Sequence, residues 1–463
     1  MSRTESIDRT KAMDRTEAMD RTEAMDRTKA IDWMEAMDTM DNAKKLFFSK
    51  ETAEKIAAGY GTPFYIYDAE GIRGAVRGLR KAFSWADFRE YFAVKACPNP
   101  YILKLLKEEG TGVDCSSYTE LLLAKACGFS GDGIMFSSNV TPAEDFEAAR
   151  SLSAIINLDD FTHIDFLEKH GGIPEEICLR YNPGGDFSIS GAIMGNPGEA
   201  KYGMTAEQIL EAVRILGEKG VRSFGLHAFL ASNMLGDDYW PALSRVLLEL
   251  ALRIRSETGV NVSFINLSGG IGIPYKPEDK PVDIEKVGAS VKKVFEEAAA
   301  RGLAMPSVKA ELGRYITGPY GVLVARAIHR KDIYRHYIGL DACAANLMRP
   351  AMYGSYHHIT VLGKENEKPA EVYDVTGGLC ENNDKFAVER PLPEIEIGDL
   401  LAIHDAGAHG FAMGYNYNGK LRSSEFLLDG DGTCRMIRRA EKPSDYFATF
   451  DFEGSDIDID GSF

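Results

Sequence analysis

Eight short apolar segments alternate with helix-like segments between residues 91 and 314, and no other feature constrains the fold as strongly. Short runs rich in β-branched and aromatic residues are typical of buried strands. The segments between them carry helix signals: Thr205 followed by Gln208 predicts a capped helix start, and Gly220 predicts where that helix ends. The strand-like segments are 91–95, 111–117, 133–138, 154–159, 176–182, 222–229, 262–268 and 307–314. Eight strands separated by helices predict a (β/α)8 barrel of the TIM type, with an open doubly wound sheet as the structural alternative.

The pattern changes after about residue 318, where strand-like segments follow one another without long helices between them. These segments are 320–328, 334–340, 357–362, 371–375, 400–405 and 425–428. They predict an all-β C-terminal domain of sandwich or barrel-like form. We therefore divide the chain into a repetitive extension (1–43), a barrel (44–318), a β domain (319–450) and an acidic, disordered tail (451–463). The first residues of the barrel region, about 44–68, are also candidates for pairing with the β domain.

The first 41 residues contain a six-residue repeat, Asp-Arg-Thr-(Lys/Glu)-Ala-Met, which runs from Asp8 to about Ile31. A step of six residues turns a helix by about 240°, so the repeat builds no continuous apolar stripe. We interpret it as a poorly ordered extension, with a helical partner-binding arm as the alternative.

Composition excludes several classes of protein. The net charge of −17 argues against a nucleic-acid partner. No run approaches the roughly 20 apolar residues of a membrane helix, and the N-terminus has no apolar signal-peptide core, so we expect a cytoplasmic protein without a membrane partner. The seven cysteines are scattered, with no C-x-x-C pair, so neither a metal site nor a disulfide framework is expected.

The residues that could carry chemistry fall at the ends of the predicted barrel strands, where active sites of such barrels lie. Lys95 ends the first strand, His227 the sixth and Glu311 the eighth, and the turn Ser268–Gly272 follows the seventh. Each has an ordinary interpretation as well: a lysine that reaches solvent, a packed core histidine, an ion pair between Glu311 and Arg314, and a tight turn.

Together these residues fit pyridoxal 5'-phosphate (PLP) as a cofactor. A lysine amine can hold the cofactor as a Schiff base. A glycine-rich turn can bind its phosphate through backbone N–H groups, which assigns this role to Gly269, Gly270 and Gly272. The imidazole of His227 would cover one face of the pyridine ring, and Glu311 would bind the ring nitrogen.

Seven motifs in order identify a family that the chain resembles. They are YFAVKA at Lys95, GLHAFLAS at His227, SGGIGI at Gly269, ELGR at Glu311, RPAMYGSYH at Arg349, GGLCENND at Cys380 and DAGAHGFAMGYNYNG at Tyr417. They are similar to those of the fold-type III PLP-dependent decarboxylases, most closely the diaminopimelate decarboxylases. The resemblance covers about residues 47–450. It implies a barrel followed by a β domain, and a homodimer in which each subunit contributes residues to the other's active site.

The resemblance also implies roles for individual residues. Lys95 and His227 match the lysine that holds the cofactor and the residue on its ring, and Ser232 lies with the phosphate-binding glycines. Tyr417 matches a tyrosine near cofactor and substrate. The remaining matches concern substrate and proton transfer: Arg314, Arg349 and Tyr353 at the distal carboxylate, Glu381 at the distal amino group, and Cys380, from the partner subunit, as the proton donor at Cα. The implied reaction is decarboxylation of meso-2,6-diaminopimelate to L-lysine and CO2, the last step of lysine biosynthesis.

Two arguments bear on the substrate. The Arg349-Pro-x-x-Tyr353 element has no use in ornithine and arginine decarboxylases, because their substrates end in a cation, whereas a guanidinium suits a carboxylate. The chain nevertheless departs from the family pattern at residues 227–232 and 193–201, at Leu312 and at His409. A decarboxylase of the same fold acting on another diamino acid or carboxylated diamine is therefore an alternative, and a non-catalytic PLP-binding regulator is a third.

Overall fold

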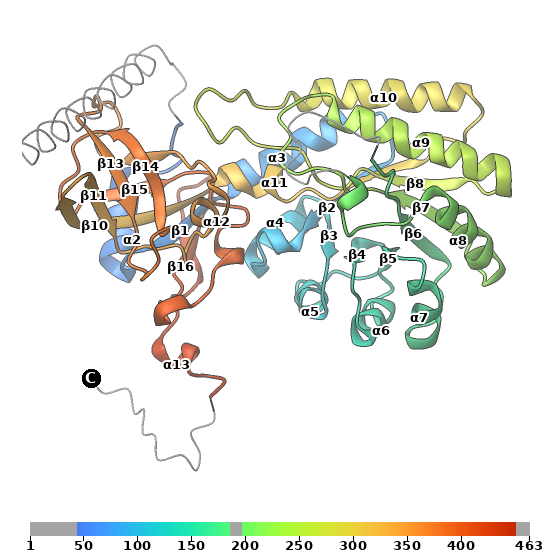
Figure 1. The fold of residues 1–463 in the computed structure, drawn as a ribbon, viewed down its shortest axis with the longest axis horizontal. Coiled ribbons are helices and arrows are strands. Elements are labelled where there is room, and N and C mark those ends of the chain that lie inside the picture. The colour runs from blue at the N-terminus through green and yellow to red at the C-terminus, as the bar shows by residue number, and fades with distance from the viewer. Residues whose placement is uncertain (1–43, 186–196, 451–463) are drawn as a thin grey trace, which may run out of the picture.

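The computed structural model describes residues 44–185 and 197–450, which form a barrel and a β-sheet domain side by side (Figure 1). The predicted extension, the predicted acidic tail and part of the atypical 193–201 segment lie outside the described residues. No helix within the described ranges is long and apolar enough to cross a membrane.

Eight parallel strands close into the barrel in chain order, and the last strand pairs with the first. The strands are β2 (Phe88–Ala93), β3 (Gly112–Cys115), β4 (Ile134–Ser138), β5 (Ile155–Leu158), β6 (Glu176–Arg180), β7 (Ser223–His227), β8 (Val262–Asn266) and β9 (Ser307–Ala310). Each overlaps one predicted segment, so the barrel prediction is confirmed. The open-sheet alternative is wrong, because pairing of β9 with β2 leaves no free edge.

Helices surround the barrel, with α5 to α7 on one side and α8 to α10 on another (Figure 1). They are α3 (Ala69–Ala82), α4 (Pro100–Glu108), α5 (Tyr118–Ala126), α6 (Ala143–Ser151), α7 (His163–His170), α8 (Ala206–Glu218), α9 (Tyr239–Thr258) and α10 (Ile284–Ala300). The predicted capping box at Thr205 is confirmed: its side chain accepts from the backbone of Gln208, whose own side chain accepts from Thr205. Gly220, with φ of 102°, follows the end of α8.

Side chains fill the interior of the barrel. Tyr91, Met135, Ile155, Cys178 and Phe264 form a buried cluster separate from the main core. Two glycines make room for its rings: a Cβ at Gly225 would lie 2.0 Å from the ring of Phe264, and one at Gly112 would lie 2.6 Å from the ring of Tyr91. The interior is therefore a packed core, and ligand space is left at the strand ends.

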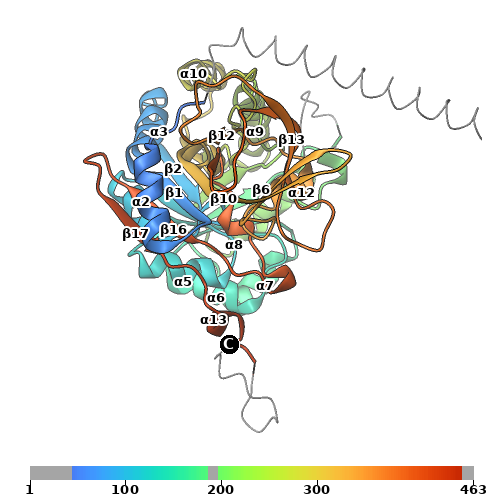
Figure 2. The same ribbon diagram turned by 90° about the vertical axis from the view of Figure 1, so that its left-hand side faces the viewer.

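The second domain is built on a nine-stranded sheet. Its strands are β1 (Phe64–Asp68), β10 (Gly321–Asp332), β11 (His336–Leu340), β12 (Ile359–Val361), β13 (Glu371–Thr376), β14 (Lys385–Leu392), β15 (Leu400–Ile403), β16 (Ser424–Leu428) and β17 (Cys434–Arg438). Strand β1 precedes the barrel in the chain but lies inside this sheet, antiparallel to β10 and parallel to β16. Helix α2 (Lys50–Tyr60) packs on the same strands through Ala53 and Ile56, as the view onto this domain shows (Figure 2).

The sequence prediction missed β14 and β17, which are the two end strands of the sheet path. Strand β14 contains Pro391 and the positive-φ residue Glu389, which break the alternation of apolar and polar residues. Both features are tolerated at a sheet edge, where one side of the strand needs no hydrogen-bond partner. Strand β17 carries arginines at positions 435 and 438, which also hide a strand pattern.

Candidate active site

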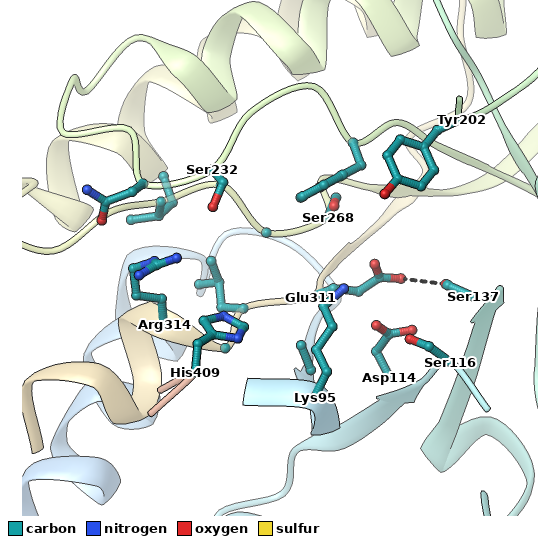
Figure 3. A pocket seen from close by; sticks show the side chains of 18 of the residues that line it. Lys95, Asp114, Ser116, Ser137, Tyr202, Ser232, Ser268, Glu311, Arg314 and His409 are labelled. Carbon is teal, nitrogen blue, oxygen red and sulfur yellow. Dashed lines mark hydrogen bonds between the residues drawn. The ribbon is translucent and has the colours of Figure 1, made fainter. Parts of the chain in front are cut away.

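A cavity of about 740 Å³ opens at the carboxyl ends of the barrel strands, where the β domain meets the barrel (Figure 3). The barrel contributes Lys95, Asp114, Ser137, Arg180, His227, Phe229, Ser232, Gly269, Gly270, Glu311 and Arg314, among others. The β domain contributes Arg349, Tyr353, Ser355, His409 and Met413. The cavity therefore contains most of the residues that the sequence predicts for the site.

Lys95 lies in a single 3-10 turn, Val94–Ala96, directly after β2. The turn is held in place because Ala93 donates to the carbonyl of Leu312 at 3.1 Å and His409 donates to the carbonyl of Ala96 at 2.8 Å. In Figure 3 the lysine side chain reaches into the cavity between Asp114 and His409. Its amine is therefore accessible to a ligand and placed by backbone hydrogen bonds from two different domains.

Asp114 on β3 is the acidic neighbour of this lysine. Burial raises the pKa of its carboxyl, the charge of Glu311 raises it further, and the charge of Lys95 opposes both. Its Oδ1 atom has no hydrogen-bond partner among the described residues. A buried polar atom without a partner at a cavity wall is a site for a ligand or for water.

Glu311 directly follows the last barrel strand, and its carboxylate interacts with side chains from three other barrel strands. Its Oε1 accepts from Asn266 at 2.7 Å and from Ser137 at 3.4 Å, and its Oε2 lies 3.1 Å from His227 Nε2. Burial favours the neutral acid, but His227 and Asn266 outweigh it and lower the pKa of Glu311. The carboxylate is therefore charged at neutral pH.

His227 is almost fully buried, and only 1% of its surface is exposed. Burial lowers the pKa of its imidazole, with Glu311 acting in the opposite direction. The neutral ring carries its proton on Nε2, because that atom faces the carboxylate of Glu311. The ring-covering role that the sequence predicts for His227 stays a prediction, since its hydrogen bond and burial commit it to Glu311.

The glycine-rich turn after β8 is pressed against the loop before α9. Met234 donates to the carbonyl of Gly270 at 2.8 Å, and Gly272 donates to the carbonyl of Met234 at 2.7 Å. A Cβ at Gly270, where φ is 98°, would lie 2.3 Å from the ring of Tyr239, and one at Gly269 would lie 2.8 Å from the carbonyl oxygen of Glu311. Only glycine fits these two positions, so bare backbone faces the cavity there.

Two serines place hydroxyl groups beside this turn. Ser232 and Ser268 line the cavity and are drawn in Figure 3. Gly272, which the sequence also assigns to phosphate binding, is not part of the wall. A Cβ there would lie 2.7 Å from the backbone of Asn233, so this glycine serves the contact between the two loops.

Two arginines line the cavity. Arg314 begins the short helix α11 (Arg314–Thr317), and Arg349 begins α12 (Arg349–Tyr353). Arg314 donates to the hydroxyl of Tyr275. Arg349 donates to Ser355 at 3.3 Å and lies 5.7 Å from the ring centroid of Tyr353.

Both arginines are at least nine-tenths buried, and within the described ranges neither forms an ion pair with a carboxylate. Burial lowers the pKa of Arg349; Tyr275 opposes this effect and the charge of Arg314 adds to it. Desolvated cations without a counterion are costly unless a ligand supplies the anion. The part of the cavity that Arg314 and Arg349 line is therefore suited to a carboxylate.

Three predicted residues lie away from this cavity. Cys380 and Glu381 are exposed, Tyr417 is 52% exposed, and none of them lines the wall. They form a group of their own, since the backbone N–H of Cys380 donates to Asn418, the residue after Tyr417, at 2.8 Å. The roles that the sequence gives to these three residues therefore stay predictions.

The sequence prediction missed several residues of the wall. Arg180 ends β6 and Asp114 is the last residue but one of β3, so an inspection of the residues near every strand end could have found them. Phe229, Tyr202 and His409 lie in loops, where position in the sequence does not reveal side-chain direction. Burial holds the pKa of His409 well below its usual range, and the charge of Arg314 adds to this effect. His409 thus presents a neutral imidazole to the cavity.

Comparison with known proteins gives one family. Residues 70–318 match the model described as pyridoxal-dependent decarboxylase, pyridoxal binding domain. The protein TabA of Pseudomonas amygdali pv. tabaci is 40% identical over 415 residues, which cover 90% of this chain and 96% of TabA. The diaminopimelate decarboxylase of Methanothermobacter thermautotrophicus is 35% identical over 401 residues, which cover 85% of this chain and 92% of that protein.

Solved structures agree with the sequence relatives. A crystal structure of the diaminopimelate decarboxylase of M. jannaschii in complex with L-lysine has a TM-score of 0.79 and 27% identity. The match covers 86% of this chain and 93% of that chain. The similarity extends over both the barrel and the β domain.

Proposed function

The chain belongs to the family of pyridoxal-dependent decarboxylases, and from this premise we propose that it decarboxylates an α-amino acid that carries a second, distal carboxylate. The substrate that fits best is meso-2,6-diaminopimelate, with L-lysine and CO2 as products. The observation that carries this proposal is the pair of buried arginines, Arg314 and Arg349, in the same cavity as Lys95. A distal carboxylate would supply the anion that both guanidinium groups lack.

The residues of the cavity fit PLP. Gly269 and Gly270 present backbone without side chains at the cavity wall, and Ser232 and Ser268 add hydroxyl donors, which together suit a phosphate. Lys95 would bind the cofactor covalently, and Glu311, charged and buried, would bind a protonated pyridine nitrogen. When bound, PLP accepts the electron pair that the departing carboxylate leaves on Cα.

Residues of the chain would bind the substrate, keep the ring nitrogen protonated and limit the access of water. Arg314 and Arg349 would bind the distal carboxylate and thereby fix the distance of Cα from Lys95. Glu311 would keep a proton on the ring nitrogen, and His227 and Asn266 would keep Glu311 charged. The walls contributed by the β domain would limit the access of water to Cα.

Return of a proton to Cα needs a donor, and we assign this step to Cys380 of the partner subunit. Cys380 and Glu381 are exposed on the β domain and are absent from the cavity of their own chain. Both positions would become useful if a second copy placed them over the cavity. We therefore also propose a homodimer with shared sites.

The relatives leave room for a second substrate of the same chemical class. TabA is more similar to this chain than the diaminopimelate decarboxylases compared with it above. The cavity wall also carries Phe229 and His409, two residues at which the sequence departs from the family pattern. A different diamino acid or carboxylated diamine with a distal carboxylate is the alternative substrate.

Release of CO2 from a panel of amino acids tests the proposal. The panel contains meso-diaminopimelate, an α-amino dicarboxylic acid of similar length without the distal amine, L-lysine, ornithine and arginine. We expect activity with the first and very little with the last three, because these leave the arginines without an anion. Activity with the amine-free diacid equal to that with meso-diaminopimelate would show that the distal amine is not recognised, which contradicts meso-diaminopimelate as the specific substrate. Preference for ornithine or lysine would refute the distal-carboxylate proposal.

A further inference from the structure

The aromatic ring that faces Lys95 belongs to Phe229. The Nζ atom of Lys95 lies 5.7 Å from the centroid of the Phe229 ring, and both residues line the cavity. Phe229 follows the end of β7 by two residues and is partly exposed, so part of its ring surface is open to a ligand. A flat apolar surface beside the cofactor-binding amine is a place where a planar heterocycle can pack.

His227 offers no such surface. With 1% of its area exposed and its Nε2 atom 3.1 Å from Glu311, it presents almost none of its ring to the cavity. Turning the imidazole toward the cofactor would break this hydrogen bond and leave Glu311 with one partner fewer in a buried position. The same carboxylate would then lose the group that contributes most to lowering its pKa.

Phe229 contacts two neighbouring side chains, Arg180 and Tyr202. The guanidinium carbon of Arg180 lies 5.6 Å from the Phe229 ring centroid and 4.3 Å from that of Tyr202, and the two rings meet edge to face at 6.2 Å. Asp159 fixes Arg180 through a buried ion pair of 2.8 Å. A guanidinium held in this way has little freedom to move, so the position of the Phe229 ring is set by two strands other than its own.

We propose that Phe229 is the cofactor-packing residue of this chain, in the role that the sequence prediction gave to His227, and that Arg180 is a positioning residue that acts through Phe229. The inference deepens the proposed function on its cofactor side and does not depend on which amino acid is the substrate. The proposal is therefore tested on the full chain with PLP and without substrate.

The first test is the affinity for PLP, followed by the visible absorption of the lysine-bound cofactor. Phe229→Leu keeps apolar volume but removes the ring, and we expect it to weaken PLP binding about tenfold, which equals ~1.4 kcal/mol. Phe229→Tyr keeps a ring and should bind PLP within about twofold of the wild type. Equal affinity in Phe229→Leu and wild type would overturn the proposal.

The second test is spectroscopic. Phe229→Trp places an indole at the proposed contact, in a chain whose natural tryptophans number three. The additional emission of the variant, taken as the difference from the wild type, should be strongly quenched when PLP binds, because stacked rings lie within contact distance. Unchanged difference emission at full PLP occupancy would also overturn the proposal.

The third test separates positioning from direct contact, because Arg180 itself reaches the cavity wall. Arg180→Met should weaken PLP binding in the wild-type background and have little further effect in the Phe229→Leu background. Full additivity of the two substitutions would show that Arg180 acts on the cofactor without Phe229, which contradicts the positioning role. Melting temperatures of all four proteins in the absence of PLP distinguish this coupling from a general loss of stability.

Discussion

Glu311 Oε2 lies 3.1 Å from Nε2 of His227, and this pair is the buried charged centre of the cavity. Three consecutive barrel strands take part in it: β7 ends at His227, β8 ends at Asn266, and Glu311 follows β9. Since His227 and the amide of Asn266 interact with it, the pKa of the carboxyl is lowered and the carboxylate stays charged although it is buried. A permanent negative charge at this depth is suited to a cationic partner in the cavity.

Replacement of Glu311 by glutamine removes this charge and keeps the shape of the side chain. If Glu311 holds a protonated ring nitrogen, Glu311→Gln should lower kcat about tenfold to hundredfold, since a hydrogen bond to a charged group contributes about 1.5–3 kcal/mol. PLP should remain bound, because Lys95 and the glycine turn are unchanged. Steady-state kinetics and cofactor content measure the two effects.

Glu120→Gln is the matched control for this substitution. Glu120 is largely buried near Lys95 and accepts from the backbone N–H of Ser116 at 2.7 Å, but it does not line the cavity. A glutamine oxygen can accept the same hydrogen bond, so kcat should change little. A similar loss of kcat in both variants would show that the effect of Glu311→Gln is a general loss of negative charge near Lys95.

Lys44 connects the start of the described chain to the core of the β domain. Its ammonium group pairs with Asp405, which is 4% exposed, and also donates to the carbonyl of Pro274. Lys44→Met leaves the carboxylate buried without a cation and should lower the free energy of unfolding at pH 8 by about 2–3 kcal/mol. Lys45→Met removes the exposed neighbouring lysine and should have almost no effect, which makes it the matched control.

The pH dependence of this loss has a definite sign. Burial raises the pKa of Asp405 to about 6, and Lys44 opposes this rise. A carboxyl whose folded pKa is above its unfolded pKa binds a proton more tightly in the folded state, so its contribution to stability decreases as the pH rises through that interval. Without Lys44 the pKa of Asp405 in the folded protein rises further. The difference in free energy of unfolding between the wild type and Lys44→Met should therefore be large at pH 8 and small at pH 5. A gap that is independent of pH would contradict the assignment.

Cys380 and Lys95 can be tested together if the sites are shared between subunits. Lys95→Ala and Cys380→Ala should each be nearly inactive, and a mixture of the two should regain activity after subunit exchange. Half of the dimers in an equal mixture are hybrids with one intact site each, so recovery should approach about a quarter of the wild-type activity. Exchange can be verified with differently tagged chains. No recovery despite verified exchange would place Cys380 and Lys95 in sites built within one chain.

The barrel could be predicted because each of its strands is recognisable from a short, continuous stretch of sequence. Each strand is a short apolar run, and the residue at its end points to the same rim as the others, so Lys95, His227 and Glu311 were found without knowledge of their contacts. The glycine turn was found for the same reason. Strand β14 was missed because an edge strand tolerates the proline and the bulge that hide its pattern.

The interior of the site depends on contacts between segments far apart in the chain, and the sequence could not supply these. Phe229 lies near Lys95 and also contacts Arg180 and Tyr202, which come from other parts of the barrel. The contact that buries His227 against Glu311 could not be predicted, because the two residues are 84 positions apart in the sequence. The surface position of Cys380 required the fold of the β domain, in which its backbone binds Asn418.

The last prediction concerns substrate selection by Arg349. The residue is 8% exposed. Its guanidinium group donates to Ser355, lies near the ring of Tyr353 and has no carboxylate partner among the described residues. Arg349→Ala should lower kcat/KM for meso-diaminopimelate about a hundredfold or more, since a charge-assisted contact of ~3 kcal/mol is lost at ~1.4 kcal/mol per tenfold. The absorption of the bound cofactor should hardly change, because Arg349 is assigned to the substrate.

Arg349→Lys separates charge from geometry. A lysine keeps the cation but cannot form two parallel hydrogen bonds to a carboxylate, so kcat/KM should fall between the values of wild type and Arg349→Ala. The substitutions should affect L-lysine and ornithine far less, because these substrates offer no distal anion to the site. If Arg349→Ala left kcat/KM for meso-diaminopimelate intact, recognition of a distal carboxylate by Arg349 would be wrong. The assignment of the cofactor would stand, because it depends on Lys95, Glu311 and the glycine turn and not on Arg349.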